Sequence, residues 1–289
     1  METIVVTGAT GTVGRLVVAG LLNAGCPVRA VSRRPQHAKL PAAAELMAGD
    51  LTEPATLEAA FAGAIQLMLV STPETAPEIV ERARRCGIEH IVLVSSAAVT
   101  AGYDTTYNLP VEQAVQASGL DCSIVRPGEF ATNALHIWGP SIRTNRSVVE
   151  PFPNQTGSPI HEADIADVVL ANLRYRERRG HIDTIIGPDI LTKRDQVAAI
   201  SAAVGEEVSL REVTPAQARD FYRTQGGFAA ANADMLFGFE SYDGVEGSID
   251  EPHDTRMDLE DTYLTLPQVT GHPARSYAQW AREHAPEFT

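Results

Sequence analysis

The amino-acid sequence predicts an α/β protein with a doubly wound parallel sheet, and three features of its first half support this prediction. Short β-branched runs alternate with helical stretches as far as about residue 127. Most of the runs are apolar throughout, as expected of parallel strands that are covered on both faces. A glycine follows each helical stretch where a helix C-terminus is expected, at Gly25, Gly63, Gly87 and Gly119. Together these features indicate βαβ repetition.

The expected elements of this half follow one another at short spacing. The strands are expected at 3–7, 27–32, 45–49, 66–71, 90–95 and 122–126. The helices between them are expected at 13–24, 53–62, 77–86 and 110–118. Right-handed crossovers would place the carboxyl ends of all these strands along one ligand-binding edge.

The regular alternation stops after Pro127. Residues 133–155 read as a loop and residues 228–261 as a mobile loop, because both are rich in turn-forming and polar residues. Thr214 is expected to cap a helix that has Pro215 at its first position. The other elements expected here are helices at 162–175, 194–204 and 276–284 and strands at 182–186 and 208–213. We therefore expect a core of residues 1–130 and a smaller region of residues 131–289, with helix 162–175 packed back on the core.

Composition excludes several classes of partner. The chain has 289 residues, of which 44% are apolar, and a net charge of −14. Such an acidic surface repels phosphate backbones and anionic lipid, so nucleic acid and membranes are not expected partners. The three cysteines form no CxxC pair and are expected to be free thiols. A strand begins directly at the N-terminus with no signal peptide or membrane span, so a cytoplasmic location is expected.

A glycine-rich loop follows the first strand and opens the first helix. It reads Gly8-Ala9-Thr10-Gly11-Thr12-Val13-Gly14. Gly8 permits the tight turn, Gly11 lets the backbone approach a pyrophosphate, and Gly14 lets the helix pack closely on the sheet. The helix N-terminus then offers N–H groups and a positive dipole to the phosphates. Strand, loop, helix and second strand are in register, which indicates a dinucleotide site.

The end of the second strand distinguishes between the two nicotinamide cofactors. Folds that select NAD usually place a carboxylate there, roughly 20 residues after the glycines, to hold the ribose 2′-hydroxyl. This chain has Ser32, Arg33 and Arg34 instead. The planar guanidinium of arginine donates two parallel hydrogen bonds to a phosphate. NADP(H) is therefore the expected cofactor.

Polar residues close the other strands along the same edge. Asp50 and Leu51 end the third strand, where a carboxylate is able to accept a hydrogen bond from the adenine amino group. Ser71 and Thr72 follow the fourth strand, and Ser95 and Ser96 follow the fifth. Each hydroxyl is a candidate for cofactor contact, and each is equally able to cap a strand end.

The segments after the glycine loop resemble the NmrA-like family of atypical short-chain dehydrogenases/reductases. The resemblance covers residues 1–173 well and the remainder loosely. It includes residues 7–14, whose glycine motif is shared by the whole superfamily. The segments more specific to this branch are residues 48–51, 92–96, 112–120, 124–130, 159–161 and 164–166. The resemblance implies an extended Rossmann fold that binds NADP(H), with cofactor contacts that include Asn108, Pro127, Gly128 and Phe130. The family contains reductases of carbonyls, quinones, dyes and unsaturated rings, and also redox-sensing regulators without turnover.

The sequence departs from the family where the proton relay is expected. Relatives that carry out chemistry use a Ser with a Tyr and a Lys in YxxxK spacing, and the Lys lowers the pKa of the Tyr. Here the Tyr slot falls on Asp104 and the Lys slot on Asn108. Tyr103 and Tyr107 lie beside these slots, but no lysine occurs between Lys39 and Lys193. The usual relay is expected to be absent, which leaves Ser96, Tyr103 and Tyr107 as the candidate catalytic residues.

Other reactive side chains fit structural roles better than catalytic ones. His90, His136 and His161 are isolated histidines, which are more often structural than catalytic. The acidic residues that begin helix 162–175 favour its positive end. No set of histidine, cysteine and carboxylate residues has the spacing of a metal site, so no metal is expected.

The sequence favours an NADP(H)-dependent reductase of a largely apolar or aromatic carbonyl, quinone or conjugated compound. Proximity and orientation would drive hydride transfer, with Ser96 and a nearby tyrosine polarising the acceptor. One alternative is a non-catalytic NADP-sensing regulator, and another is an epimerase or isomerase on the same fold. An oligomer is possible.

Arg33→Ala should weaken NADPH binding much more than NADH binding, because the lost guanidinium contacts only the 2′-phosphate. Two partly exposed arginine–phosphate contacts are worth on the order of 1–3 kcal/mol, or roughly ten- to hundredfold in affinity. Calorimetric titration of wild type and variant with both cofactors measures this preference. Equal wild-type affinities for NADPH and NADH would contradict it.

Overall fold

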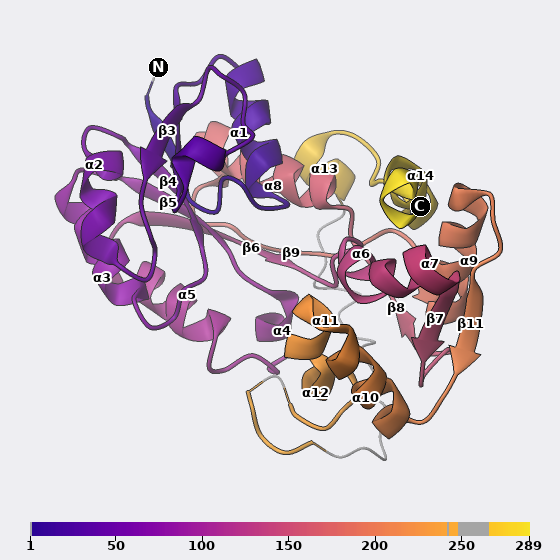
Figure 1. Ribbon diagram of the computed structural model, residues 1–289. Helices are drawn as coiled ribbons and strands as arrows, with labels where there is room; N and C mark the ends of the chain where they lie inside the picture. The colour runs from indigo at the N-terminus through magenta and orange to yellow at the C-terminus, as the bar shows by residue number, and fades with distance from the viewer. Residues whose placement is uncertain (1, 242, 248–265) are drawn as a thin grey trace. The chain divides into compact units, whose positions relative to one another are not determined.

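The computed structural model describes residues 2–241, 243–247 and 266–289 (Figure 1). Its contacts divide these residues into two compact units. Unit 1 contains the described residues of 1–127, 162–185 and 266–273. Unit 2 contains those of 128–161, 186–247 and 274–289.

Unit 1 is built on a parallel sheet of seven strands in the order β3-β2-β1-β4-β5-β6-β9. The strands are β1 (Ile4–Val6), β2 (Val28–Ser32), β3 (Glu45–Ala48), β4 (Gln66–Val70), β5 (His90–Val94), β6 (Asp121–Pro127) and β9 (Ile182–Ile185). The chain starts in the middle, moves outward to β3, and then returns to the other side of β1. This reversal defines the doubly wound Rossmann arrangement. It confirms the predicted fold class.

Helices pack on the sheet in two groups. Helices α1 (Gly14–Asn23) and α8 (Glu162–Arg174) pack against each other, and α8 also packs against α13 (Leu266–Thr270). Helices α1 and α8 approach so closely that a Cβ atom at Gly20 would lie 2.4 Å from the Leu170 side chain. The second group contains α2 (Glu58–Phe61), α3 (Ala76–Arg85) and α5 (Asn108–Ala117). Shorter elements are η1 (Pro35–His37), η2 (Pro54–Leu57), α4 (Ala97–Thr100) and η3 (Arg176–Arg178).

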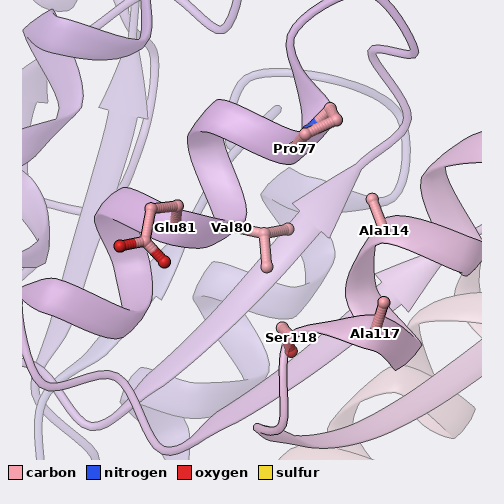
Figure 2. A pocket seen from close by; sticks show the side chains of 6 residues that line it. All are labelled: Pro77, Val80, Glu81, Ala114, Ala117 and Ser118. Carbon is pink, nitrogen blue, oxygen red and sulfur yellow. The ribbon is translucent and has the colours of Figure 1, made fainter.

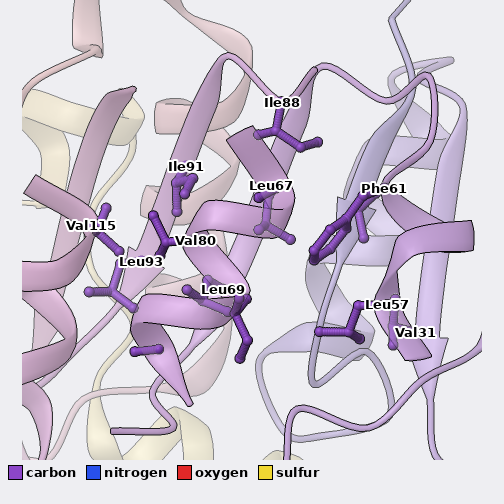
Figure 3. Close-up of a cluster of buried hydrophobic side chains, with 14 of the residues drawn as sticks. Val31, Leu57, Phe61, Leu67, Leu69, Val80, Ile88, Ile91, Leu93 and Val115 are labelled. Atoms are coloured by element: carbon purple, nitrogen blue, oxygen red, sulfur yellow. The ribbon is translucent and has the colours of Figure 1, made fainter. Parts of the chain in front are cut away.

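The second group of helices covers a continuous apolar cluster on one face of the sheet (Figure 3). Strand residues Leu67, Leu69 and Leu93 meet Phe61 of α2 and Val80 of α3 there, and all five are buried. Alternate strand residues are buried as well, because successive side chains point to opposite faces of a sheet. The central strands β1, β4 and β5 are therefore largely apolar, which explains why the sequence showed no alternation in them.

Two expectations for unit 1 need correction. Residues 53–62 do not form one helix but the 3₁₀ turn η2 followed by the short α2. Strand 182–186 was expected in the smaller region, but β9 pairs in parallel with β6 as the last strand of the main sheet. Ile185 is fully buried there, so burial against this sheet determines where the strand pairs.

Unit 2 contains two small sheets and several short helices. Strand β7 (Ser147–Glu150) pairs in parallel with β11 (Ser209–Glu212), and β8 (Thr156–Gly157) pairs in antiparallel with β10 (Leu191–Thr192). A buried cluster rich in aromatic side chains, including Trp138, Tyr222 and Trp280, forms the core. The helices are α6 (Asn133–Ile137), α7 (Gly139–Asn145), α9 (Lys193–Val204), α10 (Pro215–Gln225), α11 (Gly227–Ala231), α12 (Ala233–Leu236), α14 (Tyr277–Glu283) and η4 (Ala285–Phe288).

Both loop predictions in this unit are wrong in part. Residues 133–150 contain α6, α7 and β7, because Trp138, Ile142 and Val149 are buried in the unit 2 core, whereas residues 151–155 lie outside any helix or strand. Residues 227–236 form α11 and α12, while residues 248–261 lie outside the described residues. The predicted cap is confirmed: Thr214 accepts from the Gln217 amide and forms a capping box with it.

Three further observations complete the description. Cys26, Cys86 and Cys122 are free and half-buried, as expected. The helices of the described residues include none that is long and apolar enough to cross a membrane.

His90 is buried at the start of β5, where its ring nitrogens contact the side chains of Gln66 on β4 and Ser123 on β6 at 3.1 Å each. Burial lowers the pKa of His90 from 6.5 to about 4.

Lowering the pH should destabilise the protein through His90. The unfolded state takes up the proton at its ordinary pKa of 6.5, whereas the folded state resists it down to about pH 4. The contribution is therefore complete above pH 6.5 and is lost progressively between pH 6.5 and 4, by about 3 kcal/mol. Urea unfolding of wild type and His90→Asn at pH 7.5 and 5.0 measures it. An identical pH dependence in both proteins would contradict the assignment.

Candidate cofactor and active site

The glycine loop joins β1 to α1 and folds onto its own backbone. Gly8 has a φ of +59°, and its carbonyl oxygen accepts a hydrogen bond from the Gly11 amide at 2.9 Å. A Cβ atom at Gly14 would lie 2.2 Å from that same oxygen. Gly14 therefore permits close packing against the loop itself, which is more specific than the expected packing against the sheet.

The start of α1 fits a phosphate group. Gly8, Thr10 and Gly11 are exposed, Thr12 is half-buried and Val13 is buried. The first turn of α1 carries no acidic residue, and the first N–H groups of a helix have no partner within it. A Cβ atom at Gly11 would lie 3.1 Å from the Gly8 oxygen. The absence of a side chain at Gly11 therefore also leaves the loop backbone open to a ligand. These features fit the pyrophosphate of a nicotinamide dinucleotide.

The end of β2 presents the residues expected to read the 2′-phosphate. Arg33 and Arg34 are exposed, and the Arg34 amide donates to the Ser32 hydroxyl at 3.1 Å. Asp50 lies at the end of the neighbouring β3, and one carboxylate oxygen accepts from both the amide and the hydroxyl of Thr52. These bonds, with a smaller effect of Arg33, lower the pKa of Asp50. The carboxylate thus stays ionised, and one of its oxygens is engaged in hydrogen bonds within the local turn.

The remaining strand ends have mainly structural partners in the structure. Leu51 packs against the apolar cluster, and its carbonyl oxygen accepts from the Thr75 hydroxyl at 2.7 Å. Ser71 and Thr72 are half-buried, and the Ser71 hydroxyl lies 3.4 Å from the Val94 oxygen. Ser96 accepts from the Ala98 amide at 3.1 Å and so caps α4. The hydroxyls of Ser71 and Ser96 thus have hydrogen-bond partners at the ends of these strands, as the structural role predicts.

Ser95 belongs to a buried ionic network rather than to an open strand end. Its hydroxyl donates to the carboxylate of Glu112, which is 1% exposed. Glu112 also accepts from the Arg126 guanidinium, whose Nε lies 2.9 Å away. Arg126 continues to Thr100 at 3.1 Å, and Thr100 meets Thr184 at 2.8 Å. The network joins α5 to the carboxyl ends of β5, β6 and β9.

The signal for this network was present in the sequence. Glu112 is the one charged residue of α5, and Arg126 follows the apolar run Ile124–Val125 of β6. Charges at such positions are expected to be paired when they are buried. Both residues lie in segments that resemble the family, but the sequence alone predicted no role for either.

The residues in the two relay slots bind each other. The Asp104 carboxylate is 1% exposed, and it accepts from the Asn108 amide at 2.9 Å, the Asn108 side-chain amide and the Tyr107 amide at 3.0 Å. Asp104 thereby satisfies the first N–H groups of α5. Asn108 is itself 5% exposed, so its side chain is directed into this cap.

The two candidate tyrosines are accessible. Tyr103 is 52% exposed and Tyr107 is 48% exposed. The Tyr107 hydroxyl lies 3.5 Å from the Ser71 carbonyl oxygen, which places it at the end of β4. Partial burial, with Glu74 and Asp104 nearby, raises the pKa of Tyr107. The phenol therefore remains protonated and is available as a hydrogen-bond donor.

Residues 127–130 span the boundary between the two units. Pro127 is buried at the end of β6 in unit 1. Gly128 and Phe130 belong to unit 2, where Phe130 forms a bridge with Ile160. The histidines singled out earlier also have partners within their units: His161 lies 3.2 Å from Glu283, and His136 stacks at 5.5 Å on Phe228.

One group of side chains has an arrangement that the spacing of the sequence did not indicate. Asp164, Asp167 and His272 each offer one potential ligand atom, and these atoms lie within 4.8 Å of one another. His272 comes from the end of the chain and reaches Asp167 at 3.2 Å. The tertiary structure alone brings these three residues together.

A shallow pocket of about 220 Å³ lies between α3 and α5 (Figure 2). Its lining is mostly apolar, and it contains none of the predicted site residues. The lining residues are Pro77, Val80, Glu81, Ala114, Ala117 and Ser118.

The fold and the glycine loop define the class of protein: a dinucleotide-binding protein of the Rossmann type. A family model described as NAD(P)H-binding matches residues 8–176. Two curated relatives match over 99% of this chain and 99% of their own length. One is a (4-alkanoyl-5-oxo-2,5-dihydrofuran-3-yl)methyl phosphate reductase from Streptomyces griseus, 30% identical, and the other an NAD(P)H azoreductase from Xenophilus azovorans, 31% identical.

Solved structures share the fold at lower identity. The Citrobacter triphenylmethane reductase complexed with NADP(H) has a TM-score of 0.76 at 19% identity, covering 98% of this chain and 99% of that one. The negative transcriptional regulator NmrA in complex with NADP has a TM-score of 0.72 at 17% identity, covering 99% and 95%. The chain therefore belongs to the NAD(P)H-binding family. NAD(P)H is its cofactor, and the protein is an oxidoreductase.

Replacing Gly11 by alanine should weaken NADPH binding at least tenfold while the protein still folds. The added methyl stands on the loop surface, and the Gly8 oxygen 3.1 Å away needs to move only slightly. Gly14→Ala is the matched comparison and should lower the melting temperature strongly, because its methyl would lie 2.2 Å from backbone. Calorimetric titration and thermal unfolding measure both effects. Normal NADPH binding by folded Gly11→Ala would show that the loop does not hold the pyrophosphate.

Proposed function

We propose that this protein is an NADPH-dependent reductase of a conjugated, largely apolar small molecule, and that it works without a Tyr–Lys relay. The observation that carries the relay-free part of the proposal is the Asp104–Asn108 pair in the relay slots. Both side chains are buried in a helix cap, and neither supplies a cation that would depress a phenol pKa. By their names, the two curated relatives reduce an unsaturated lactone that carries a methyl phosphate group and an azo compound, and both acceptors are conjugated.

The residues of unit 1 then act by binding and orientation. NADPH supplies the hydride when it is bound. The glycine loop and α1 hold its pyrophosphate, and Arg33 and Arg34 hold the 2′-phosphate. Tyr107 stays protonated and donates a hydrogen bond to the acceptor, as does Ser96 or Tyr103. Water or a hydroxyl of the substrate delivers the proton that completes the reduction.

We infer that the two units have different roles in binding. Unit 1 carries every predicted cofactor residue except Gly128 and Phe130. We assign the cofactor to unit 1 and the recognition of the substrate to unit 2, whose aromatic core and short helices differ from the regular sheet architecture. The substrate is a small molecule, and its apolar or aromatic character is part of this proposal.

A second candidate function is an NADP-sensing regulator without turnover. The same Asp104–Asn108 pair favours it, because a protein that only senses the cofactor has no need of a proton relay. Oxidation of NADPH, followed at 340 nm with quinones, azo dyes and unsaturated lactones, separates the two functions. Reduction of at least one acceptor supports the reductase. NADPH binding with no reduction of any acceptor supports the sensor.

Tyr103→Phe, Tyr107→Phe and Ser96→Ala should each retain turnover, within roughly tenfold of wild type. A neutral hydrogen-bond donor contributes on the order of 1–2 kcal/mol, far less than an essential acid. The pH–rate profiles of the three variants should also keep every ionisation of the wild-type profile. Loss of all turnover in one variant, with NADPH binding unchanged, would identify a dedicated acid and overturn the relay-free mechanism.

A further inference from the structure

Unit 1 contains three potential metal ligands that the predicted cofactor site does not use. Asp164 and Asp167 lie three residues apart near the start of α8, so their side chains share one face of this helix. His272 comes from the other end of the chain, and all three residues belong to unit 1. One potential ligand atom of each residue lies within 4.8 Å of the other two. The cluster thus combines one imidazole with two carboxylates.

The backbone around α13 determines where His272 lies. Within unit 1, α13 packs against α8 (Figure 1). Helix α13 ends at Thr270, and Gly271 then turns the chain with a φ of +77°. The His272 amide donates to the Thr270 hydroxyl at 3.4 Å, and that hydroxyl in turn donates to the Leu266 carbonyl oxygen at 2.8 Å. The turn therefore holds His272 in a defined place beside α8.

The imidazole ring of His272 has the orientation of a metal ligand. Its Nδ1 lies 3.0 Å from the Pro273 carbonyl oxygen. A carbonyl oxygen only accepts, so Nδ1 carries the proton, and Nε2 faces the Asp167 carboxylate at 3.2 Å. Metal-binding histidines usually donate their second N–H to a carboxylate or to a backbone carbonyl in this way. Nε2 then holds either a second proton, in an ion pair with Asp167, or a metal ion.

The spacing of the ligand atoms fits a transition metal ion. Zinc binds imidazole nitrogen and carboxylate oxygen at about 2.0–2.2 Å, so two ligand atoms of a tetrahedral site lie about 3.4 Å apart. The 3.2 Å between His272 Nε2 and Asp167 Oδ2 matches this spacing. A ligand atom as far as 4.8 Å away needs only a rotation of its side chain to join them. The three side chains therefore form a nearly complete coordination set.

The cluster is buried on one side and accessible on the other. Asp164 is 0% exposed, whereas the side chains of Asp167 and His272 are 28% and 41% exposed. A buried carboxylate on a helix gives an ion a fixed anchor. The exposed imidazole gives the ion a path of entry from solvent, which a metal site requires.

The ligand types select the class of ion. Mg²⁺ and Ca²⁺ take oxygen ligands, so a histidine in the set disfavours both. Soft ions such as Cu(I) are selected by thiolate or thioether ligands, and this cluster has neither. One imidazole with two carboxylates suits Zn²⁺ and the neighbouring divalent transition metals. Three protein ligands leave the fourth position of a tetrahedral site to water.

We propose that Asp164, Asp167 and His272 bind a divalent transition metal ion such as Zn²⁺, and that this ion fastens the end of α13 to α8. The inference goes beyond the proposed function, because the ion has a structural role and no part in hydride transfer. The spacing of residues along the sequence predicted no metal site. The ligands come from segments that only the fold of unit 1 brings together.

The test titrates zinc chloride into the full-length protein after treatment with a chelator and buffer exchange. Calorimetry should show one zinc ion per chain that binds more tightly than any further zinc, and magnesium chloride should give no such binding. With free zinc at about 100 times its Kd, the melting temperature should rise by about 5 °C. Amide hydrogen exchange in residues 266–272 should slow when zinc is bound. Co²⁺ in place of zinc should give visible absorption bands that report the coordination.

His272→Ala and Asp167→Asn each remove one ligand. Both should weaken zinc binding at least tenfold and abolish the zinc-dependent rise in melting temperature, since losing even a hydrogen-bonding partner of a metal ligand costs roughly ten- to hundredfold. Both side chains are partly exposed, so the zinc-free variants should fold. His181→Ala is the matched control, because His181 is an exposed histidine of unit 1 outside the cluster. It should bind zinc as wild type does.

Three outcomes would overturn the site, and none depends on whether the protein reduces any substrate. In the first, wild type binds no zinc. In the second, His272→Ala and Asp167→Asn bind zinc with wild-type affinity, which places the bound ion elsewhere. The third is an ion pair only: the two variants lower the melting temperature of the zinc-free protein, while zinc leaves the melting temperature and the amide exchange of wild type unchanged.

Discussion

The approach of Gly14 to the carbonyl oxygen of Gly8 is the contact on which the cofactor site depends. It brings the start of α1 directly over the turn that ends β1, with no space for even a methyl group. The first N–H groups of the helix are thereby gathered at one point of the sheet edge. Because β1 lies between β2 and β4, the ends of these strands surround the same point. Arg33 and Arg34, which we propose to hold the 2′-phosphate, follow β2 at this edge.

The opposite half of the edge is organised by buried charge. Glu112 and Arg126 form a network that joins α5 to β5, β6 and β9, while Asp104 caps the start of the same helix. Glu112 and Asp104 accept hydrogen bonds from the Ser95 hydroxyl and the Asn108 side-chain amide, two groups that were predicted to contact the cofactor. In the mechanism that we propose, these structural polar contacts stand where a proton relay was expected, and conjugated acceptors make small demands on a general acid.

Sequence reasoning was most successful where a local rule determines structure. The strands of unit 1 and the cap at Thr214 were all predicted within a residue or two, because apolar runs, glycines and capping residues act over short distances. It failed for 133–155, where Trp138 and Ile142 are separated by polar residues and only their burial in a shared core reveals helices. The partners of Ser95 and Asn108 were also beyond reach, because hydroxyl and amide groups bond to whatever the fold brings near.

By itself the sequence determined the α/β class, the glycine loop and the arginines at the end of β2, since each depends on residues adjacent in the chain. Only the tertiary structure decided that β9 completes the main sheet, that Asp104 and Asn108 bind each other, and that Lys193 forms an ion pair with Glu129. The last two residues are far apart in sequence. Their proximity depends on how apolar surfaces pack across the whole of unit 2, which no local pattern encodes.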